Sequence, residues 1–223
     1  MPQRKTVRPA SFEEGAATLS EWARTHVKQI AIGAVFVLGV VGGVYLYREA
    51  SEAKERNAAR QLSSAAGSLQ SNNIPLATRD LEQLVTRFEG TRSAQEGALI
   101  LTQLLYEQGR YQDGINRIEP LTRSEEPHIA ASAHNLVGAG YEQLSQFPKA
   151  AESYQKAAET TKFPNEKAAY LASAARAYGG AGNLAEAKKI WTQLAEDPRT
   201  PAATSSEARV RLGEINAQLA TRG

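Results

Sequence analysis

The pattern of apolar and polar positions divides the chain near residue 48. Residues 29–47 carry no charge and lie between Lys28 and Arg48, whereas later apolar residues recur at helical spacing among polar ones. At ~1.5 Å per residue the uncharged run makes a helix of just under ~30 Å, about the thickness of the hydrocarbon layer of a bilayer. It has no polar face, and Tyr45 and Tyr47 lie at its C-terminal edge, where aromatic residues favour lipid headgroups. The pattern predicts a single transmembrane helix over residues 29–47.

Two other interpretations of this run are a cleaved signal peptide and a buried core helix. Basic residues precede the run, and Ser51-Glu52-Ala53 is the only triplet after it that resembles a cleavage site. However, the run exceeds the usual ~7–15 apolar residues of a signal peptide, and the segment before it is long. A core helix of this length would normally show a polar face. We therefore favour the membrane anchor over both alternatives.

The anchor has one face of small residues. Ala31, Val35, Gly39 and Gly43 fall on one side of the helix, and the spacing Gly39-x-x-x-Gly43 permits close packing against another transmembrane helix. Glycine is also frequent in membrane helices that make no such contact. The pattern is compatible with both a packing face and an ordinary membrane helix.

The charges that flank the anchor favour one orientation by a small margin. The leader comprises residues 1–28. Residues 12–30, which end just inside the anchor, are predicted to form an amphipathic helix that would lie on the membrane surface. The leader holds Arg4, Lys5, Arg8, Arg24 and Lys28, against Arg48, Lys54, Arg56 and Arg60 on the other flank. Five basic residues against four favour a cytoplasmic N-terminus under the positive-inside rule. In a bacterial inner membrane the large C-terminal part would then be periplasmic.

Beyond the anchor, turn signals recur with a fixed period. They are Asn72-Asn73-Ile74, Gly109-Arg110-Tyr111, Ser145-Gln146-Phe147 and Gly182-Asn183-Leu184, separated by 37, 36 and 37 positions. Each triplet lies between two segments whose apolar residues have helical spacing. A repeat of this length, built of helix–turn–helix units, is typical of an α-solenoid.

The residues around these turns resemble the tetratricopeptide repeat, which alternates small and large residues at fixed positions. The fourth copy has Ala175, Tyr178, Gly182, Leu184, Ala187, Trp191 and Leu194, with Pro198 after it. The third copy has Gly138, Tyr141, Ser145, Phe147, Ala150, Tyr154 and Ala157, with Pro164 after it. The second has Leu105, Gly109, Tyr111, Gly114, Ile118 and Leu121, then Pro127. The first is degenerate, with Ala65, Asn72, Ile74, Ala77, Leu81 and Leu84.

This resemblance covers residues 58–200 and implies an all-α fold. We expect a single N-terminal transmembrane helix followed by a tetratricopeptide-like α-solenoid of about four helical hairpins. A juxtamembrane helix over residues 48–70 would merge into the first repeat, and residues 201–223 would form a C-terminal capping helix. The aromatic residues named above are expected to pack in the core between repeats.

Composition excludes several kinds of chemistry. Lys and Arg exceed Asp and Glu by 26 to 24, so the chain lacks the concentrated positive charge of a nucleic-acid-binding protein. There is no cysteine, which excludes disulfides and thiol catalysis. His128 and His134 are six residues apart, a spacing that does not place them on one helical face, and there is no phosphate loop or nucleophile elbow. We predict a protein that is not an enzyme and has no catalytic residues, metal site or cofactor.

Stacked helical hairpins of this kind commonly bind peptides in a concave groove lined by the first helix of each repeat. By phase with the repeat, Tyr106, Asn135, Glu142 and Arg176 are the candidates for contacts with a partner. An ordinary solvated face is the alternative for each of them.

The layout as a whole resembles the YfgM-like ancillary subunits of the bacterial Sec translocon. The shared features are a short leader, one Gly-rich anchor and a juxtamembrane helix that leads into degenerate repeats. The resemblance implies a periplasmic repeat domain that holds or hands on newly translocated chains, with translocon subunits, chaperones and unfolded clients as partners. One alternative is an accessory structural subunit of a larger membrane complex. Another is a soluble peptide-binding module, if the apolar segment is cleaved.

Overall fold

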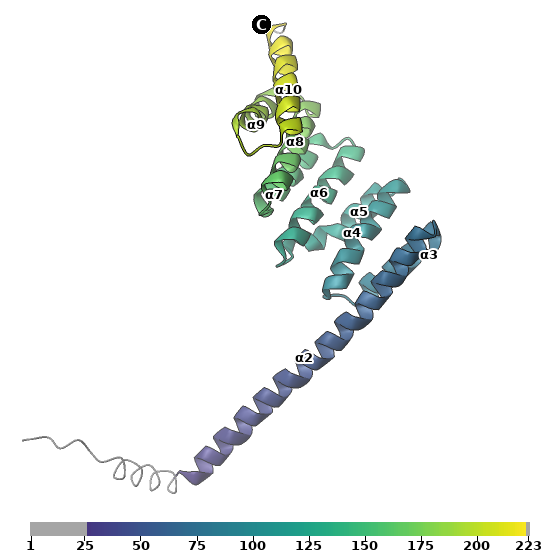
Figure 1. Cartoon of the computed structure of the whole chain (residues 1–223), viewed down its shortest axis with the longest axis vertical. Helices are drawn as coiled ribbons and strands as arrows, with labels where there is room; N and C mark the ends of the chain where they lie inside the picture. The colour runs from purple at the N-terminus through teal and green to yellow at the C-terminus, as the bar shows by residue number, and fades with distance from the viewer. Residues whose placement is uncertain (1–25, 222–223) are drawn as a thin grey trace, which may run out of the picture. The chain divides into compact units, whose positions relative to one another are not determined.

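The computed structural model describes residues 26–221, and every regular element in that range is helical (Figure 1). The elements are α2 (Val27–Gln70), α3 (Ile74–Arg87), α4 (Arg92–Glu107), α5 (Tyr111–Ile118), the 3-10 helix η1 (Glu119–Arg123), α6 (Pro127–Gln143), α7 (Phe147–Thr160), α8 (Pro164–Gly180), α9 (Leu184–Glu196) and α10 (Ala202–Ala220). Residues 12–25 of the predicted leader helix lie outside the described residues. The expected all-helical repeat fold is confirmed.

The chain forms two units, residues 1–53 and residues 54–223. The described part of the first unit is the beginning of α2, which runs without a break through the predicted anchor and juxtamembrane segments. Large apolar side chains of this unit are exposed, among them Phe36 at 71% and Leu46 at 69%. Among the helices that the described residues form, none is both long and apolar enough to cross a membrane.

In the second unit, successive helices pack against each other as hairpins. The C-terminal part of α2 pairs with α3, and the following hairpins are α4 with α5, α6 with α7, and α8 with α9; α10 packs on the last of these (Figure 1). Buried side chains form three adjoining clusters, along α2–α4, α4–α6 and α7–α10. Each hairpin therefore buries its apolar face against its neighbours, as expected of a solenoid.

The turn inside each hairpin has the same backbone geometry. The first residue of each predicted triplet has positive φ: Asn72 at 56°, Gly109 at 73°, Ser145 at 57° and Gly182 at 76°. The third residue of each triplet is the first residue of α3, α5, α7 or α9. Glycine adopts this conformation without a steric penalty, which explains why two of the four positions are glycine.

Side-chain caps fix where several of these helices begin. Asn73 Oδ1 accepts a hydrogen bond from the Leu76 N–H at 3.2 Å, and Asn183 Oδ1 accepts one from the Glu186 N–H at 3.3 Å. The Thr91 hydroxyl accepts a hydrogen bond from the Ala94 N–H at 3.2 Å. These bonds satisfy backbone donors that the first turn of a helix leaves free.

Glu55 forms a cap that no local pattern predicts. Its carboxylate accepts hydrogen bonds from the backbone N–H groups of Arg92 at 2.8 Å and Ser93 at 3.1 Å, and from the Ser93 hydroxyl at 2.6 Å. Burial would raise the pKa of Glu55, but the hydrogen bonds from Ser93 and Arg92 outweigh it and hold the pKa below its ordinary value. A residue of α2 thus stabilises the N-terminus of α4.

Candidate functional site

Tyr106, the first predicted groove residue, is tied into the contact between helices. Its hydroxyl donates a hydrogen bond to the Leu136 carbonyl of α6 at 2.8 Å, and its ring centroid lies 5.8 Å from that of Tyr111. The side chain fills the space that the absent Cβ atoms of Gly114 and Gly140 leave free. Burial, with a smaller contribution from Tyr141, raises the pKa of Tyr106. The residue therefore connects the second repeat with the third.

Glu142 also makes an internal contact. Its carboxylate accepts a hydrogen bond from the Tyr154 hydroxyl at 2.6 Å, which joins α6 to α7. Burial raises the pKa of Tyr154, the hydrogen bond and charge of Glu142 raise it further, and the positive charge of Arg176 opposes them. An electrostatic interaction with Tyr106 also raises this pKa. Glu142 thus contacts Tyr154 directly, and Tyr106 and Arg176 influence its pKa. The sequence placed Tyr154 in the core.

Arg176 links the last repeat to the capping helix. Its guanidinium lies 2.8 Å from the Glu207 carboxylate of α10 and donates a second hydrogen bond to Ser173 at 3.1 Å. Because both charged side chains are partly exposed, the pair is expected to contribute at most ~1 kcal/mol. Asn135 is half-buried on α6. That these four residues bind a partner stays a prediction.

The predicted packing face of the anchor is open where the structure describes it. Ala31, Gly39 and Gly43 are exposed, and a Cβ atom added to either glycine would meet nothing within 4 Å. The side chain of Val35 lies outside the described set. The face is available to another helix, and its use stays a prediction.

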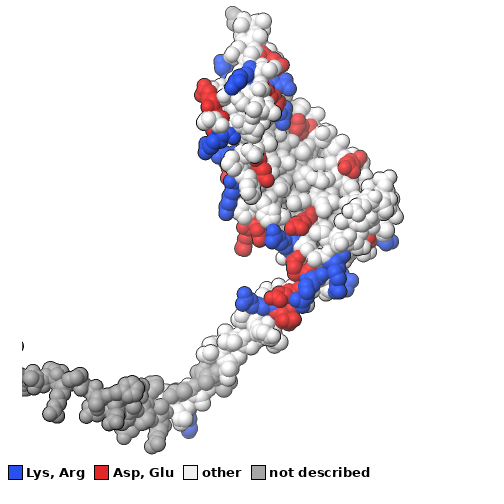
Figure 2. Space-filling view, in the orientation of Figure 1, with Lys and Arg blue, Asp and Glu red and all other residues white. Residues whose placement is uncertain are grey.

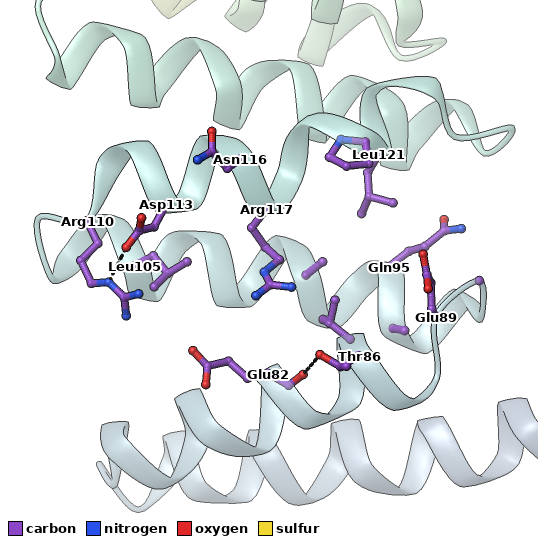
Figure 3. Close-up of a pocket in the computed structure, with 15 residues that line it drawn as sticks. Glu82, Thr86, Glu89, Gln95, Leu105, Arg110, Asp113, Asn116, Arg117 and Leu121 are labelled. Carbon is purple, nitrogen blue, oxygen red and sulfur yellow. Dashed lines mark hydrogen bonds and ion pairs between the residues drawn. The ribbon is translucent and has the colours of Figure 1, made fainter.

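A groove of about 600 Å³ lies between α3 and α5, where the sequence predicted no site. Its apolar lining comes from Ala94, Ala98 and Leu105 of α4, from Val85 of α3 and from Leu121 of η1. Leu105 and Leu121 are labelled in Figure 3. The two alanines are too small to fill the gap between α3 and α5. We call this feature the α3–α5 groove. The small residues at these positions of α4 are the only signal that could have revealed it from sequence.

Charged side chains line the rims of the α3–α5 groove. Glu82 and Glu89 lie on the α3 side, and Arg110 and Arg117 extend from the α5 side toward it (Figure 3). Arg110 pairs with Asp113 at 2.8 Å. Glu82, Glu89 and Arg117 make no ion pair within the part of the chain that the structure describes.

A second cavity, of about 620 Å³, lies between η1, α6 and α7, and its chemistry differs. The Lys149 ammonium lies 5.1 Å from the centre of the Tyr141 ring and donates a hydrogen bond to Gln146 at 2.8 Å. Charged side chains make up half of the remaining lining: Glu119, Arg123, Glu152 and Lys156. The α3–α5 groove is therefore the better candidate for contact with apolar side chains of a partner.

The described residues contain no cluster of three or more His, Cys, Asp or Glu that could hold a metal ion. Burial, followed by the charge of Lys156, lowers the pKa of His134, while Glu159 opposes the shift. His128 lies 3.6 Å from Glu126 in a partly exposed pair.

Comparison with known proteins agrees with this geometry. Residues 20–126 match a family described as a tetratricopeptide repeat-like domain. The fold is tetratricopeptide-like. One similar crystal structure contains the nearly identical TPR-like repeats of a Podosopora anserina protein assigned as a kinesin light chain. Its sequence is 17% identical to this chain, and the two structures superpose with a TM-score of 0.59 over 76% of this chain and 89% of that chain.

A second similar structure is BtubC (BKLC) from P. vanneervenii, at 15% identity and a TM-score of 0.54, over 74% of this chain and 83% of that chain. No curated protein matches the chain. At these identities the likeness shows the fold alone.

Proposed function

We propose that the protein is a non-catalytic scaffold that binds other proteins through its repeat domain. The observation that carries the proposal is the α3–α5 groove, which combines apolar lining residues with three rim charges, Glu82, Glu89 and Arg117, that have no ion-pair partner among the described residues. Every buried side-chain N or O atom in the described residues has a hydrogen-bond partner, so the framework around the groove is internally satisfied. Rigid frameworks with open apolar grooves suit protein recognition.

The second part of the proposal is attachment to a membrane through residues 29–47. Its support is the absence of charge along this run in the sequence, together with the exposure of its described apolar side chains, which form the largely white stretch of α2 in Figure 2. The run also includes Ile30, Gly33, Ala34 and Val35, whose side chains lie outside the described set. This part therefore rests mainly on the sequence. In the proposed arrangement, residues 29–47 span a bacterial inner membrane, with the N-terminus in the cytoplasm and the repeat domain in the periplasm.

For the biological setting we propose an ancillary subunit of the Sec translocon and its periplasmic chaperones, since the layout resembles that family. The alternative is an accessory structural subunit of another membrane complex. The open face of Gly39 and Gly43 favours the alternative, because an accessory subunit would use it to pack on a partner helix.

Site-specific photo-crosslinking in intact cells tests the binding function. A crosslinker at Asn116, which lines the α3–α5 groove, should capture a defined set of proteins. The same crosslinker at Lys188, exposed on α9 and outside the groove lining, is the control. A further crosslinker at Asn135 tests the predicted concave face. If neither Asn116 nor Asn135 captures a protein that Lys188 does not, the scaffold proposal is wrong.

Fractionation and protease accessibility test the membrane part. The full chain should remain in membranes after alkaline carbonate extraction, and Val37→Arg with Val41→Arg should release it, because charge inside the bilayer is costly. Protease added to spheroplasts should degrade the repeat domain. Protection of the repeat domain from protease would place it in the cytoplasm. If the mass of the mature protein corresponds to an N-terminus near Ala53, the apolar run is instead a cleaved signal peptide.

A further inference from the structure

The rims of the α3–α5 groove carry opposite charge. Glu82 is on α3 and Glu89 follows the C-terminal end of α3, while Arg117 is on α5 and faces the groove (Figure 3). Arg110 is also on the α5 rim, but Asp113 neutralises it at 2.8 Å. The unpaired charges are thus two carboxylates on one side and one guanidinium on the other.

The backbone around the groove offers few partners for an extended peptide. The lining residues of α3 are 82, 85 and 86, which lie on one face of the helix within its last two turns. The N–H groups of these residues are paired within the helix and only the carbonyls of its last turn are left without an intrahelical partner, so a bound strand would leave most of its own backbone unsatisfied. A bound helix satisfies its backbone internally and packs its side-chain ridges between those of α3 and α5.

We propose that the α3–α5 groove binds an amphipathic α-helix of a partner protein, and binds it in one direction only. This inference rests on the proposed scaffold function. The partner helix has an apolar stripe that contacts Val85, Leu121 and the alanines of α4. Basic residues flank the stripe on the side that faces Glu82 and Glu89, and acidic residues flank it on the side that faces Arg117.

The direction in which the partner helix binds follows from the different charges on its two flanks. Turning such a helix end for end in the groove exchanges its two flanks, so that like charges then face each other on both rims. Each exposed pair gained or lost changes the affinity by about 1.4- to 5-fold. Two or three such pairs favour one direction by about tenfold at low salt, and the preference falls as salt is added.

Designed peptides of about 14 residues provide the probe. The two-sided peptide has a Leu/Ala stripe with Lys along one flank and Glu along the other. The mixed peptide has the same composition with both charges distributed over both flanks. We expect the full chain in detergent micelles to bind the two-sided peptide about tenfold more tightly by fluorescence anisotropy. Equal affinity for the two peptides would overturn the inference.

A photo-crosslinker at the peptide N-terminus reports the direction. It should label one end of the groove, near either Arg110 or Gln95, and not both. The triple variant Glu82→Lys, Glu89→Lys and Arg117→Glu should bind the two-sided peptide with similar affinity but label the opposite end. Lys188→Glu on α9 is the control and should change neither result. Labelling of both ends in the unmodified chain, or no change of end in the triple variant, would contradict a directional site.

Two further outcomes separate this inference from the function on which it depends. If the triple variant captures the same cellular partners at Asn135 and neither peptide binds, the scaffold function stands and the inference fails. If sedimentation shows a dimer that the triple variant loses, a second copy of this chain occupies the groove, and the inference of a separate partner is wrong.

Discussion

The N-terminal and C-terminal halves of the repeat domain share the geometry of their turns but differ in the side chains that fill the space between their helices. At the position of the large residue in the second helix, the N-terminal repeats have Leu81 and Ile118, and the C-terminal repeats have Tyr154 and Trp191. The Tyr154 hydroxyl joins α6 to α7 through Glu142, and Tyr178 donates to Gln155 at 2.7 Å. Aromatic residues thus supply both volume and polar links in the C-terminal half.

The N-terminal half obtains its polar links differently. Glu55 caps α4 from α2, and Gln61 donates a hydrogen bond to the Asp80 carbonyl of α3 at 3.1 Å. With aliphatic residues and alanines between its helices, this half leaves the α3–α5 groove open with a more apolar lining, whereas polar and charged residues line most of the cavity between η1, α6 and α7. The difference teaches that the repeat sets the spacing of the helices, while residue type at a few positions decides the chemistry of the gaps that remain.

Removal of the largest aromatic residue should have the greatest effect. Trp191 is 2% exposed, and Trp191→Ala should lower the free energy of unfolding by about 3–5 kcal/mol, since it removes most of a buried side chain. Leu84→Ala, at a fully buried position of the N-terminal half, should cost about 2–4 kcal/mol. Urea unfolding of the full chain measures both. A larger loss at Leu84 would contradict the greater role assigned to aromatic filling.

The junction between the halves should be sensitive to a single methyl group. A Cβ at Gly140 would collide with the Tyr106 hydroxyl and lie 2.6 Å from Ile115 Cγ1, so Gly140→Ala should cost about 1–3 kcal/mol. Gly213 in α10 has no neighbour within 4 Å of such a Cβ, and Gly213→Ala should be neutral or stabilising by up to ~1 kcal/mol. Thermal unfolding of the two variants provides the comparison, and equal effects would show that Tyr106 can move aside.

The shared turn geometry predicts effects that are the same in both halves. Gly109→Ala and Gly182→Ala should each cost about 1–2 kcal/mol, because alanine is strained at positive φ. Ser145→Gly should stabilise by up to ~1 kcal/mol, since serine already bears that strain. Asn72→Gly should change less, because asparagine tolerates this conformation. Denaturant midpoints test the series, and a cost at only one of the two glycines would mean that the turns are not equivalent.

The smallest expected effect is a difference in pH dependence between the halves. The pKa of Glu55 is lowered, so its contribution to stability is present above the unfolded value of ~4.5 and is lost as the pH falls below it. The pKa of Tyr154 is raised, so its contribution is lost as the pH rises above ~10. Hydrogen exchange should therefore show the N-terminus of α4 loosening in acid, and in alkali the contacts of Tyr154 and of Tyr106, whose pKa is also raised.

Two conservative variants check the residues responsible. Glu55→Gln should remove most of the acid sensitivity of α4, and Tyr154→Phe should reduce the alkaline sensitivity of α7. If the acid transition is unchanged in Glu55→Gln, other carboxylates cause it.

Much of the fold follows from the sequence because its signals are local. The four turn triplets, with Asn73 and Asn183 as caps, fix where helices begin, and the repeat period fixes which helices pair. The small and large positions in each copy identify the buried residues, and Trp191, Leu81 and Leu84 are all in the core. Each of these features depends on residues within one hairpin or the next.

Tertiary structure alone decided the features that join distant residues. Glu55 reaches α4 across 37 positions of sequence, and Tyr106 and Glu142, predicted to face a partner, are hydrogen-bonded between helices. The α3–α5 groove depends on the separation of α3 and α5 next to Ala94 and Ala98 of α4. The spacing of apolar residues in the sequence does not predict that separation. A repeat pattern states which residues turn inward; only the packed helices show which of them meet and which leave a space.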